Sequence, residues 1–210
     1  MTVLIRGIYT SSVNESRARP IGPYVRGAVS IQPWDTRAVA VAERVSRLIR
    51  ETRPDLVVEH IGSTAVPGLP GKGIVDLGAE ADPADIPAIT AAMYEVGFGP
   101  QPGPDAWPPT RPMHVGSFEL DGREFLVHFH VHPRGGDLSH DLMFRDALRA
   151  DPTLAAEYAR VKADVVAGAD GPLDRLVYQE TKGDWIVETY DRLGIPRPEP
   201  PAAALKESGT

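Results

Sequence analysis

The sequence predicts an α/β fold in which a mixed sheet of about five strands is flanked by helices and followed by a C-terminal helical part. Residues 57–80 hold two apolar, β-branched runs on either side of a Gly-Ser pair, as expected for two strands joined by a turn. Residues 34–52 repeat apolar side chains at helical spacing. The Asp121-Gly122 pair separates two further apolar runs, which indicates a β-hairpin.

The elements are expected in the order helix, strand, strand, helix, hairpin, helices. The first helix is expected to end before Pro54, because a residue that precedes proline avoids the helical conformation. The two central strands are expected at residues 56–58 and 74–77. The other expected elements are a helix from Asp82 to Val96 closed by Gly97, a loop at 99–112, hairpin strands at 113–120 and 123–132, and helices from Asp137 onward.

Three segments divide the chain. Residues 31–194 are expected to form the main domain. Residues 1–30 mix a short apolar start with a polar, Pro- and Gly-containing region, which predicts an N-terminal arm, either as an extra strand or as a loose segment. Residues 195–210 are rich in Pro and Ala and are expected to form a flexible tail.

Composition excludes several classes of function. The 29 acidic residues outnumber the 22 basic ones, so no nucleic-acid partner is expected. The absence of cysteine excludes a disulfide, a thiolate nucleophile and a zinc–thiolate site. Because no long apolar stretch is found at the N-terminus or elsewhere, we expect a cytoplasmic protein without a membrane partner.

Three blocks of the sequence resemble a known family. HIGSTAVPGLPGKGIVDL at residues 60–77 is similar to the signature of the GrpB family, and FRDALRADPTLAAEYARVKADV at 144–165 and YQETKGDWI at 178–186 match later blocks in the same order. The chain is identified as a member of that family over residues 29–193. The GrpB family in turn resembles the nucleotidyltransferase superfamily, which includes DNA polymerase β and the aminoglycoside nucleotidyltransferases.

The resemblance implies a nucleotidyltransferase-like fold and an enzyme that uses a nucleoside triphosphate, with ATP favoured, and magnesium or another divalent cation. The expected substrate is a small-molecule acceptor. Two reactions fit: nucleotidyl transfer to the acceptor, or ATP-dependent activation of a carboxylate followed by amide formation. Fold alone cannot decide between them.

Phosphate-binding residues are implied by the same blocks. In the superfamily, the turn that corresponds to Gly62 and Ser63 brings backbone N–H groups to the triphosphate, which glycine permits because it has no Cβ. Lysine and arginine side chains in the other blocks can neutralise phosphate. The implied nucleotide-binding set is Gly62, Ser63, Thr64, Lys72, Arg145 and Lys182, and Lys162 and Tyr178 lie in the same blocks. An ordinary turn and solvated surface cations explain these residues as well.

Asp76 stands in an otherwise apolar strand. A buried carboxylate is costly unless it is paired or binds a cation, so Asp76 is predicted to be a metal ligand and a catalytic residue. Active nucleotidyltransferases usually carry a second carboxylate two residues later, where this chain has Gly78. The gap favours an alternative reading, a non-catalytic or regulatory nucleotide-binding module.

A row of histidines is the last candidate. His128, His130 and His132 alternate in VHFHVH, and on a strand this spacing points all three to one face. The resemblance places His130, with His128, where the superfamily supplies its third carboxylate, and adds His60 as a metal ligand beside Asp76. Imidazole binds transition metals and acts as a general base near neutral pH. A metal-dependent enzyme built on the histidines alone, and purely structural histidines, remain the alternatives.

Overall fold

The computed structural model describes residues 19–25, 27, 30–103, 106–168 and 175–196, and only the backbone of residues 175–181. Its sheet has five strands in the order β1-β2-β5-β4-β3. β2 and β5 are parallel and the other pairs are antiparallel, which confirms the predicted mixed sheet. The strands are β1 (Glu59–Ile61), β2 (Val75–Ala81), β3 (Gly99–Pro100), β4 (Met113–Leu120) and β5 (Arg123–Pro133).

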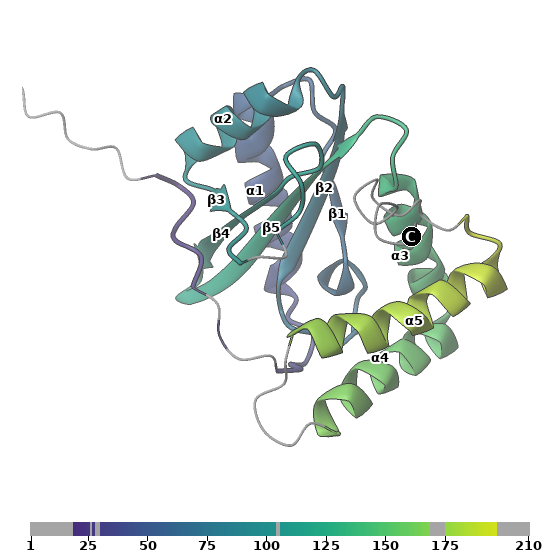
Figure 1. Cartoon of the computed structure of the whole chain (residues 1–210). Helices are drawn as coiled ribbons and strands as arrows, with labels where there is room; N and C mark the ends of the chain where they lie inside the picture. Colours follow the sequence, from purple (N-terminus) through teal and green to yellow (C-terminus); the bar gives the residue numbers. More distant parts are fainter. Residues whose placement is uncertain (1–18, 26, 28–29, 104–105, 169–174, 197–210) are drawn as a thin grey trace, which may run out of the picture.

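Two helices, α1 (Arg37–Thr52) and α2 (Ile86–Val96), pack on one face of the sheet (Figure 1). Their apolar side chains join the inward-facing strand residues in one hydrophobic core. α2 begins later than expected, because residues 83–85 form a turn in which the Asp85 N–H donates to the Asp82 carbonyl over 2.9 Å. It ends as predicted at Gly97, whose φ of 112° is the left-handed conformation that suits glycine.

Three further helices form the C-terminal helical part: α3 (Leu138–Ala150), α4 (Pro152–Ala167) and α5 (Arg175–Leu193). They gather near the β1 edge of the sheet (Figure 1). Their aromatic side chains make a second hydrophobic core, which also takes in Val66 and Leu69 from the segment after β1. The helical part is therefore packed directly on the turn that follows β1. The side chain of Tyr178 and residues 197–210 of the expected tail lie outside the described part of the chain.

The first predicted strand is wrong by three residues. β1 pairs with β2 only from Glu59, opposite Gly78, to Ile61, opposite Asp76. In the segment before it, Leu56 and Val58 are buried but Val57 is 73 % exposed. The apolar residues 56–58 therefore alternate between buried and exposed positions but do not pair with another strand. The sequence pattern alone does not specify where pairing begins. The predicted hairpin is confirmed: Asp121 and Gly122, at φ values of 50° and 71°, join β4 to β5.

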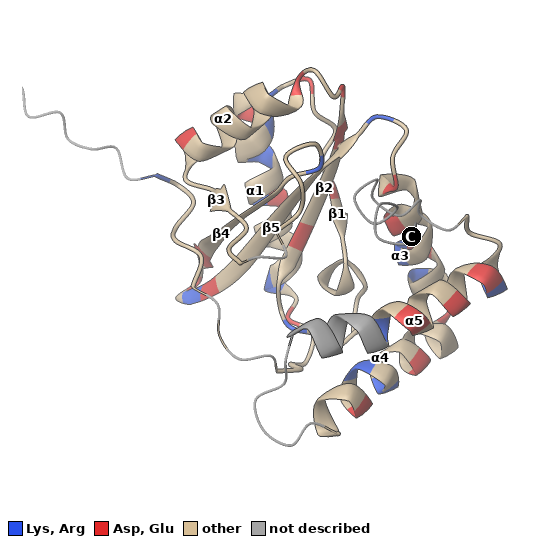
Figure 2. Cartoon of the chain, viewed as in Figure 1, with Lys and Arg blue, Asp and Glu red and all other residues tan. Residues whose placement is uncertain are grey.

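Charged residues of both signs occur along the described parts of α3, α4 and α5 (Figure 2). The described parts of these three helices therefore present no long surface of a single sign that would suit a polyanion. Among the helices described, none combines the length and the apolar character needed to cross a membrane.

Candidate functional site

The turn after β1 touches the carboxylate of β2. Gly62 has a φ of 71°, and a Cβ placed on it would lie 2.5 Å from Asp76 Oδ2, so only glycine allows this approach. Residues Ser63–Ala65 then form a short 3₁₀ turn. Trp34 Nε1 donates to the Thr64 carbonyl over 3.0 Å, and the Thr64 hydroxyl donates to the Ile74 carbonyl over 3.0 Å. The Thr64 hydroxyl thus ties the turn to β2 and is already used within the protein.

Asp76 gathers two of the predicted histidines. Parallel pairing sets Asp76 opposite His128, and His130 follows on the same face. His128 Nδ1 lies 3.1 Å and His130 Nε2 lies 3.7 Å from Asp76 Oδ1. Burial alone would raise the pKa of Asp76, but its interactions with His128 and His130 hold that pKa below its usual range.

These three side chains form a candidate cation site. One ligand atom from each lies within 4.8 Å of the others, a grouping that no other set of acidic and histidine side chains in the described residues reaches. The donors are two imidazoles and one carboxylate, a set that suits a first-row transition cation such as Mn²⁺, Fe²⁺ or Zn²⁺. Mg²⁺, which prefers oxygen ligands, fits the set less well.

His60 does not join this group, contrary to the prediction. Its strand register sets it opposite Leu77, a core residue on the other face of the sheet. The Thr64 hydroxyl donates to a carbonyl, so it accepts the hydrogen of His60 Nε2, 3.0 Å away. Burial lowers the pKa of His60 to about 4, so its ring is neutral and Nε2 is occupied at neutral pH. The third member of the cation group is therefore His128, and not His60 as predicted.

His132 continues the row of histidines but faces α3. Its ring is fully buried, with Nδ1 at 3.6 Å from Asp137 Oδ1 and Nε2 at 3.9 Å from Asp141 Oδ2. These distances exceed a hydrogen bond. His132 therefore lies next to the candidate site and outside the group that could hold one cation.

A lysine that was not placed in the predicted set lies on the other side of the turn. Lys162 of α4 is 1 % exposed, and its ammonium donates to Ser63 Oγ over 3.2 Å and to the Pro70 carbonyl. A Cβ on Gly71 would lie 3.0 Å from Ser63 Cβ and 3.6 Å from Lys162 Nζ, so this glycine leaves room for the contact. The sequence carried a signal for it: Leu154, Tyr158 and Lys162 follow one face at four-residue spacing, which puts a lysine on an apolar stripe.

Lys162 is also the centre of a positively charged group. Burial, together with the smaller effect of repulsion from Lys182 and Lys72, lowers the pKa of Lys162 to about 7. Two lysines of the predicted set therefore lie close enough to act on Lys162. A buried ammonium with cationic neighbours is relieved when an anion binds, as phosphate would.

Arg145 is placed elsewhere by the structure. Its guanidinium donates to Glu59 Oε2 and to the His60 carbonyl, both over 3.0 Å, and to Asp146 over 2.8 Å. These contacts tie α3 to β1 and engage the donors that the phosphate role would need. The prediction of Arg145 as a nucleotide-binding residue is not supported, because its side chain faces β1 and not the Ser63 turn.

The position of the missing second carboxylate is filled by α3. A Cβ on Gly78 would lie 2.6 Å from Leu138 Cδ1 and 3.2 Å from Ile61 Cδ1. A side chain at this position would require the Leu138 and Ile61 side chains to move. In this structure the Leu138 side chain therefore occupies the position that a carboxylate two residues after Asp76 would take.

Gly78→Asp is accordingly expected to lower the free energy of unfolding by about 1–3 kcal/mol or more, because it overpacks the core and buries a charge. Urea unfolding measures this change. Gly183→Asp is the matched control, since a Cβ at Gly183 on α5 meets no atom within 4 Å. Adding Leu138→Ala should restore part of the loss, and a Gly78→Asp variant as stable as the parent would show that α3 does not close this position.

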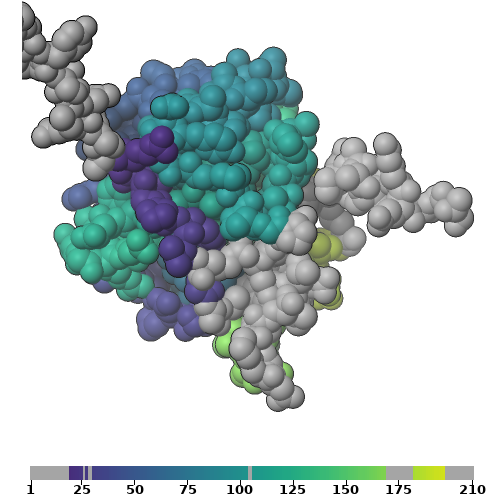
Figure 3. All heavy atoms as spheres, turned by 60° about the vertical axis from the view of Figure 1, so that its left-hand side comes forward, coloured from purple at the N-terminus to yellow at the C-terminus, as the bar shows by residue number. Residues whose placement is uncertain are grey.

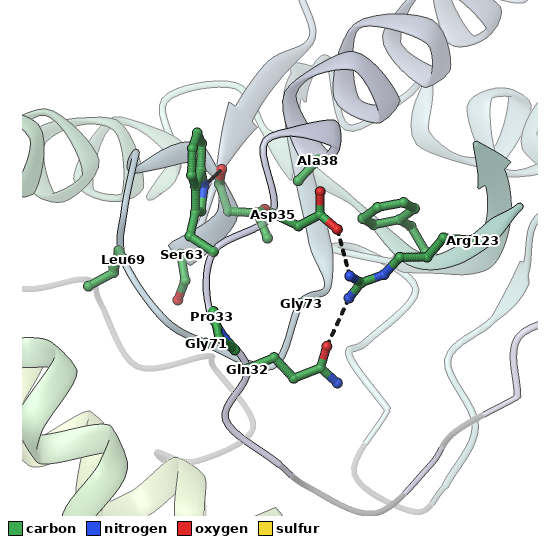
Figure 4. A pocket seen from close by; sticks show the side chains of 12 residues that line it. Gln32, Pro33, Asp35, Ala38, Ser63, Leu69, Gly71, Gly73 and Arg123 are labelled. Atoms are coloured by element: carbon green, nitrogen blue, oxygen red, sulfur yellow. Dashed lines mark hydrogen bonds and ion pairs between the residues drawn. The ribbon is translucent and has the colours of Figure 1, made fainter. Parts of the chain in front are cut away.

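Behind the turn lies a small pocket that is partly open to solvent (Figure 4). Ser63, Gly71 and Gly73 line one side, and Arg123 reaches across the other to Asp35 over 2.5 Å and Gln32 over 2.9 Å. Arg37 and Arg123 hold the pKa of Asp35 at about 2. The charged groups of this pocket, Asp35 and Arg123, are therefore paired with each other.

Comparisons with known proteins identify the family of this chain. Residues 28–192 match the GrpB protein family. A UPF0157 protein of Streptomyces coelicolor, SCO7215, is 33% identical over 178 residues, which cover 80% of this chain and 86% of the relative. The crystal structure of the conserved protein GrpB from Enterococcus faecalis superposes with a TM-score of 0.55 at 17% identity, over 77% of this chain and 99% of that one. The Cid1 poly(U) polymerase bound to MgGTP gives a TM-score of 0.48 at 17% identity, over 64% of this chain and 45% of that one. The family match and the Streptomyces relative together show that the chain belongs to the GrpB family.

Proposed function

We propose that this protein binds a nucleoside triphosphate together with a divalent cation and transfers or uses a nucleotidyl group on a small acceptor. The observation that supports this most is the contact between Gly62 and Asp76, where a missing Cβ lets the turn meet the carboxylate. A nucleotide carries its cation on its phosphate oxygens, so a site for both must set the phosphate turn beside the cation ligands.

The phosphate end of the proposed site is formed by Ser63 and Lys162, whose side chains are in contact. Lys72 and Lys182 add positive charge, as their effect on the pKa of Lys162 indicates. Phosphate oxygens would give the buried Lys162 side chain an anionic partner, which favours its protonated form. Binding of the triphosphate should therefore be accompanied by uptake of a proton.

The cation end is formed by Asp76, His128 and His130. A bound cation would neutralise phosphate charge at the reacting phosphorus. Because two of the three donors are imidazoles, we expect Mn²⁺ to support nucleotide binding better than Mg²⁺. His130 would act as the third ligand or as the base that removes a proton from an acceptor hydroxyl. A carboxylate acceptor needs no such base, so a ligand role for His130 favours carboxylate activation.

A second candidate function is a nucleotide-binding or regulatory module without turnover. The packing of Leu138 against Gly78 favours it, since the site then lacks the carboxylate that two-metal chemistry usually requires. Calorimetry with ATP and either Mn²⁺ or Mg²⁺ tests binding, and a pyrophosphate-release assay over hydroxyl and carboxylate acceptors tests turnover. Binding without turnover over that panel supports the module, and no binding with either cation overturns both candidates.

Ser63→Ala is expected to weaken nucleotide binding about 10- to 100-fold. The loss of one hydrogen bond to a charged group costs about 1.5–3 kcal/mol, and each 1.4 kcal/mol corresponds to a factor of ten. Calorimetric titration of ATP in the presence of Mn²⁺ measures the change. Ser139→Ala, on the exposed side of α3, is the control and should bind as the parent does. Equal affinity of the parent and the Ser63 variant would remove Ser63 from the phosphate site.

A further inference from the structure

We infer that Tyr24, which precedes the residues matched to the family, positions His128 for cation binding. The Tyr24 hydroxyl lies 3.0 Å from His128 Nε2, and His128 Nδ1 lies 3.1 Å from Asp76 Oδ1. The family match begins at residue 28. A segment outside the shared domain thus reaches the centre of the candidate site. The inference rests on the proposed cation site.

The segment that carries Tyr24 is anchored to the body of the protein. Ile21 is 3 % exposed and its N–H donates to the Val96 carbonyl over 3.2 Å. Gly22 and Ser117 exchange backbone hydrogen bonds of 2.9 and 3.0 Å along the edge of β4. Figure 3 shows this segment in purple, lying across the surface of the later, teal-coloured parts of the chain. The segment that carries Tyr24 is therefore fixed both to β4 and to the end of α2, so the position of Tyr24 does not depend on its contact with His128 alone.

The two contacts of His128 fix which nitrogen carries the proton. An ionised carboxylate has no hydrogen to give, so His128 Nδ1–H donates to Asp76. In the neutral ring Nε2 then accepts, and the Tyr24 hydroxyl must donate to it. Hydroxyl, imidazole and carboxylate form a continuous hydrogen-bonded series.

Cation binding requires the opposite tautomer. His128 offers Nδ1 on the side of Asp76, and a nitrogen that binds a cation cannot keep its proton. The neutral ring then carries its proton on Nε2, which donates to the Tyr24 oxygen. A phenol hydroxyl both donates and accepts, so Tyr24 can hold the ring in either state. Metal-binding histidines commonly use such an outer partner to fix the ring and its tautomer.

The expected effect of removing this partner is a loss of cation affinity. Mutation of an outer hydrogen-bond partner typically costs about 10- to 100-fold in metal binding. Tyr24→Phe keeps the ring, which lies 5.5 Å from the His128 ring, and removes only the hydroxyl. We expect Mn²⁺, titrated without nucleotide in a calorimeter, to bind this variant about 10- to 100-fold more weakly than the parent.

Two variants separate this role from simple packing. Ile21→Val loosens the same segment while leaving the hydroxyl, and Tyr94→Phe removes a hydroxyl from α2, where Tyr94 contacts His114 on the other face of the sheet. Both should bind Mn²⁺ as the parent does. If Tyr94→Phe loses as much affinity as Tyr24→Phe, the loss does not depend on the contact between the Tyr24 hydroxyl and His128, and the inference fails.

A spectroscopic readout follows the tautomer itself. In ¹⁵N NMR of the parent, His128 should be protonated at Nδ1 without a cation and at Nε2 with Zn²⁺. Equal Mn²⁺ affinity of Tyr24→Phe and the parent, or a His128 tautomer that Zn²⁺ leaves unchanged, would overturn the inference. A parent protein that binds neither Mn²⁺ nor Zn²⁺ would instead overturn the proposed cation site.

Discussion

An Asp76→Asn variant is expected to fold and to lose cation-dependent nucleotide binding. Asp76 is the sole carboxylate of the described cation group, so its replacement leaves two imidazoles and no negative charge to hold a divalent ion. Its interactions with His128 and His130 hold its pKa below the usual value, which means that the ionised form is favourable in the folded state. The variant should therefore melt no higher than the parent.

Thermal shift with and without ATP and Mn²⁺ measures both properties. The parent should gain stability when both ligands are present, because a ligand that binds only the folded state raises its melting temperature. Asp76→Asn should show no such gain. Asp146→Asn is the control, since Asp146 is 56% exposed on α3 and pairs with Arg145. An Asp76→Asn variant stabilised as strongly as the parent would remove Asp76 from the site and leave nucleotidyl transfer without its main support.

Lys162→Met is expected to weaken ATP binding about 10- to 100-fold, by the loss of one charged hydrogen bond of about 1.5–3 kcal/mol. Methionine keeps most of the length of the side chain and fits an apolar surrounding. Arg160→Met, on the exposed side of the same helix, is the control. Calorimetry in two buffers of different ionisation enthalpy should also show proton uptake on ATP binding by the parent near pH 7, and none by Lys162→Met. Unchanged affinity and proton uptake in the Lys162 variant would contradict its phosphate role.

The same lysine predicts how stability depends on pH. Its pKa is about 7 in the folded protein, against 10.5 for a lysine side chain in the unfolded chain, so between these values the unfolded chain binds more protons. The free energy of unfolding should therefore rise as pH increases from about 7 toward 10.5, and this contribution should be absent in Lys162→Met. Urea unfolding at several pH values in this range measures the difference between the two proteins.

The candidate site was predictable where local periodicity decides the outcome. Alternation along β5 put His128 and His130 on one face, and the apolar strand around Asp76 marked a carboxylate in need of a partner. The prediction that His60 binds the cation was wrong, because the face of the sheet on which His60 lies depends on the register between β1 and β2. The sequence of one strand does not specify that register. The nucleotide-binding role predicted for Arg145 is not supported for a similar reason, since the direction of its side chain depends on how α3 packs against β1.

Two contributions to the candidate site depend on contacts between residues that lie far apart in the sequence. Tyr24 reaches His128 across 104 positions of sequence, and Lys162 reaches Ser63 across 99. Contacts of this kind are set by the packing of whole elements. For Lys162 a buried lysine on an apolar helix face was visible in the spacing, whereas nothing in the neighbourhood of Tyr24 distinguishes it from any other aromatic residue.

The contact between Lys162 and the Ser63 turn joins two hydrophobic cores. The cation ligands stand on strands of the core that includes α1 and α2, and Lys162 stands on a helix that belongs to the second core. A nucleotide that engages both ends would be a cross-link between the two hydrophobic cores. Its binding energy would then oppose the local opening of the helical part, so that the rigidity of the C-terminal helices becomes a property of the occupied site and not of the chain alone.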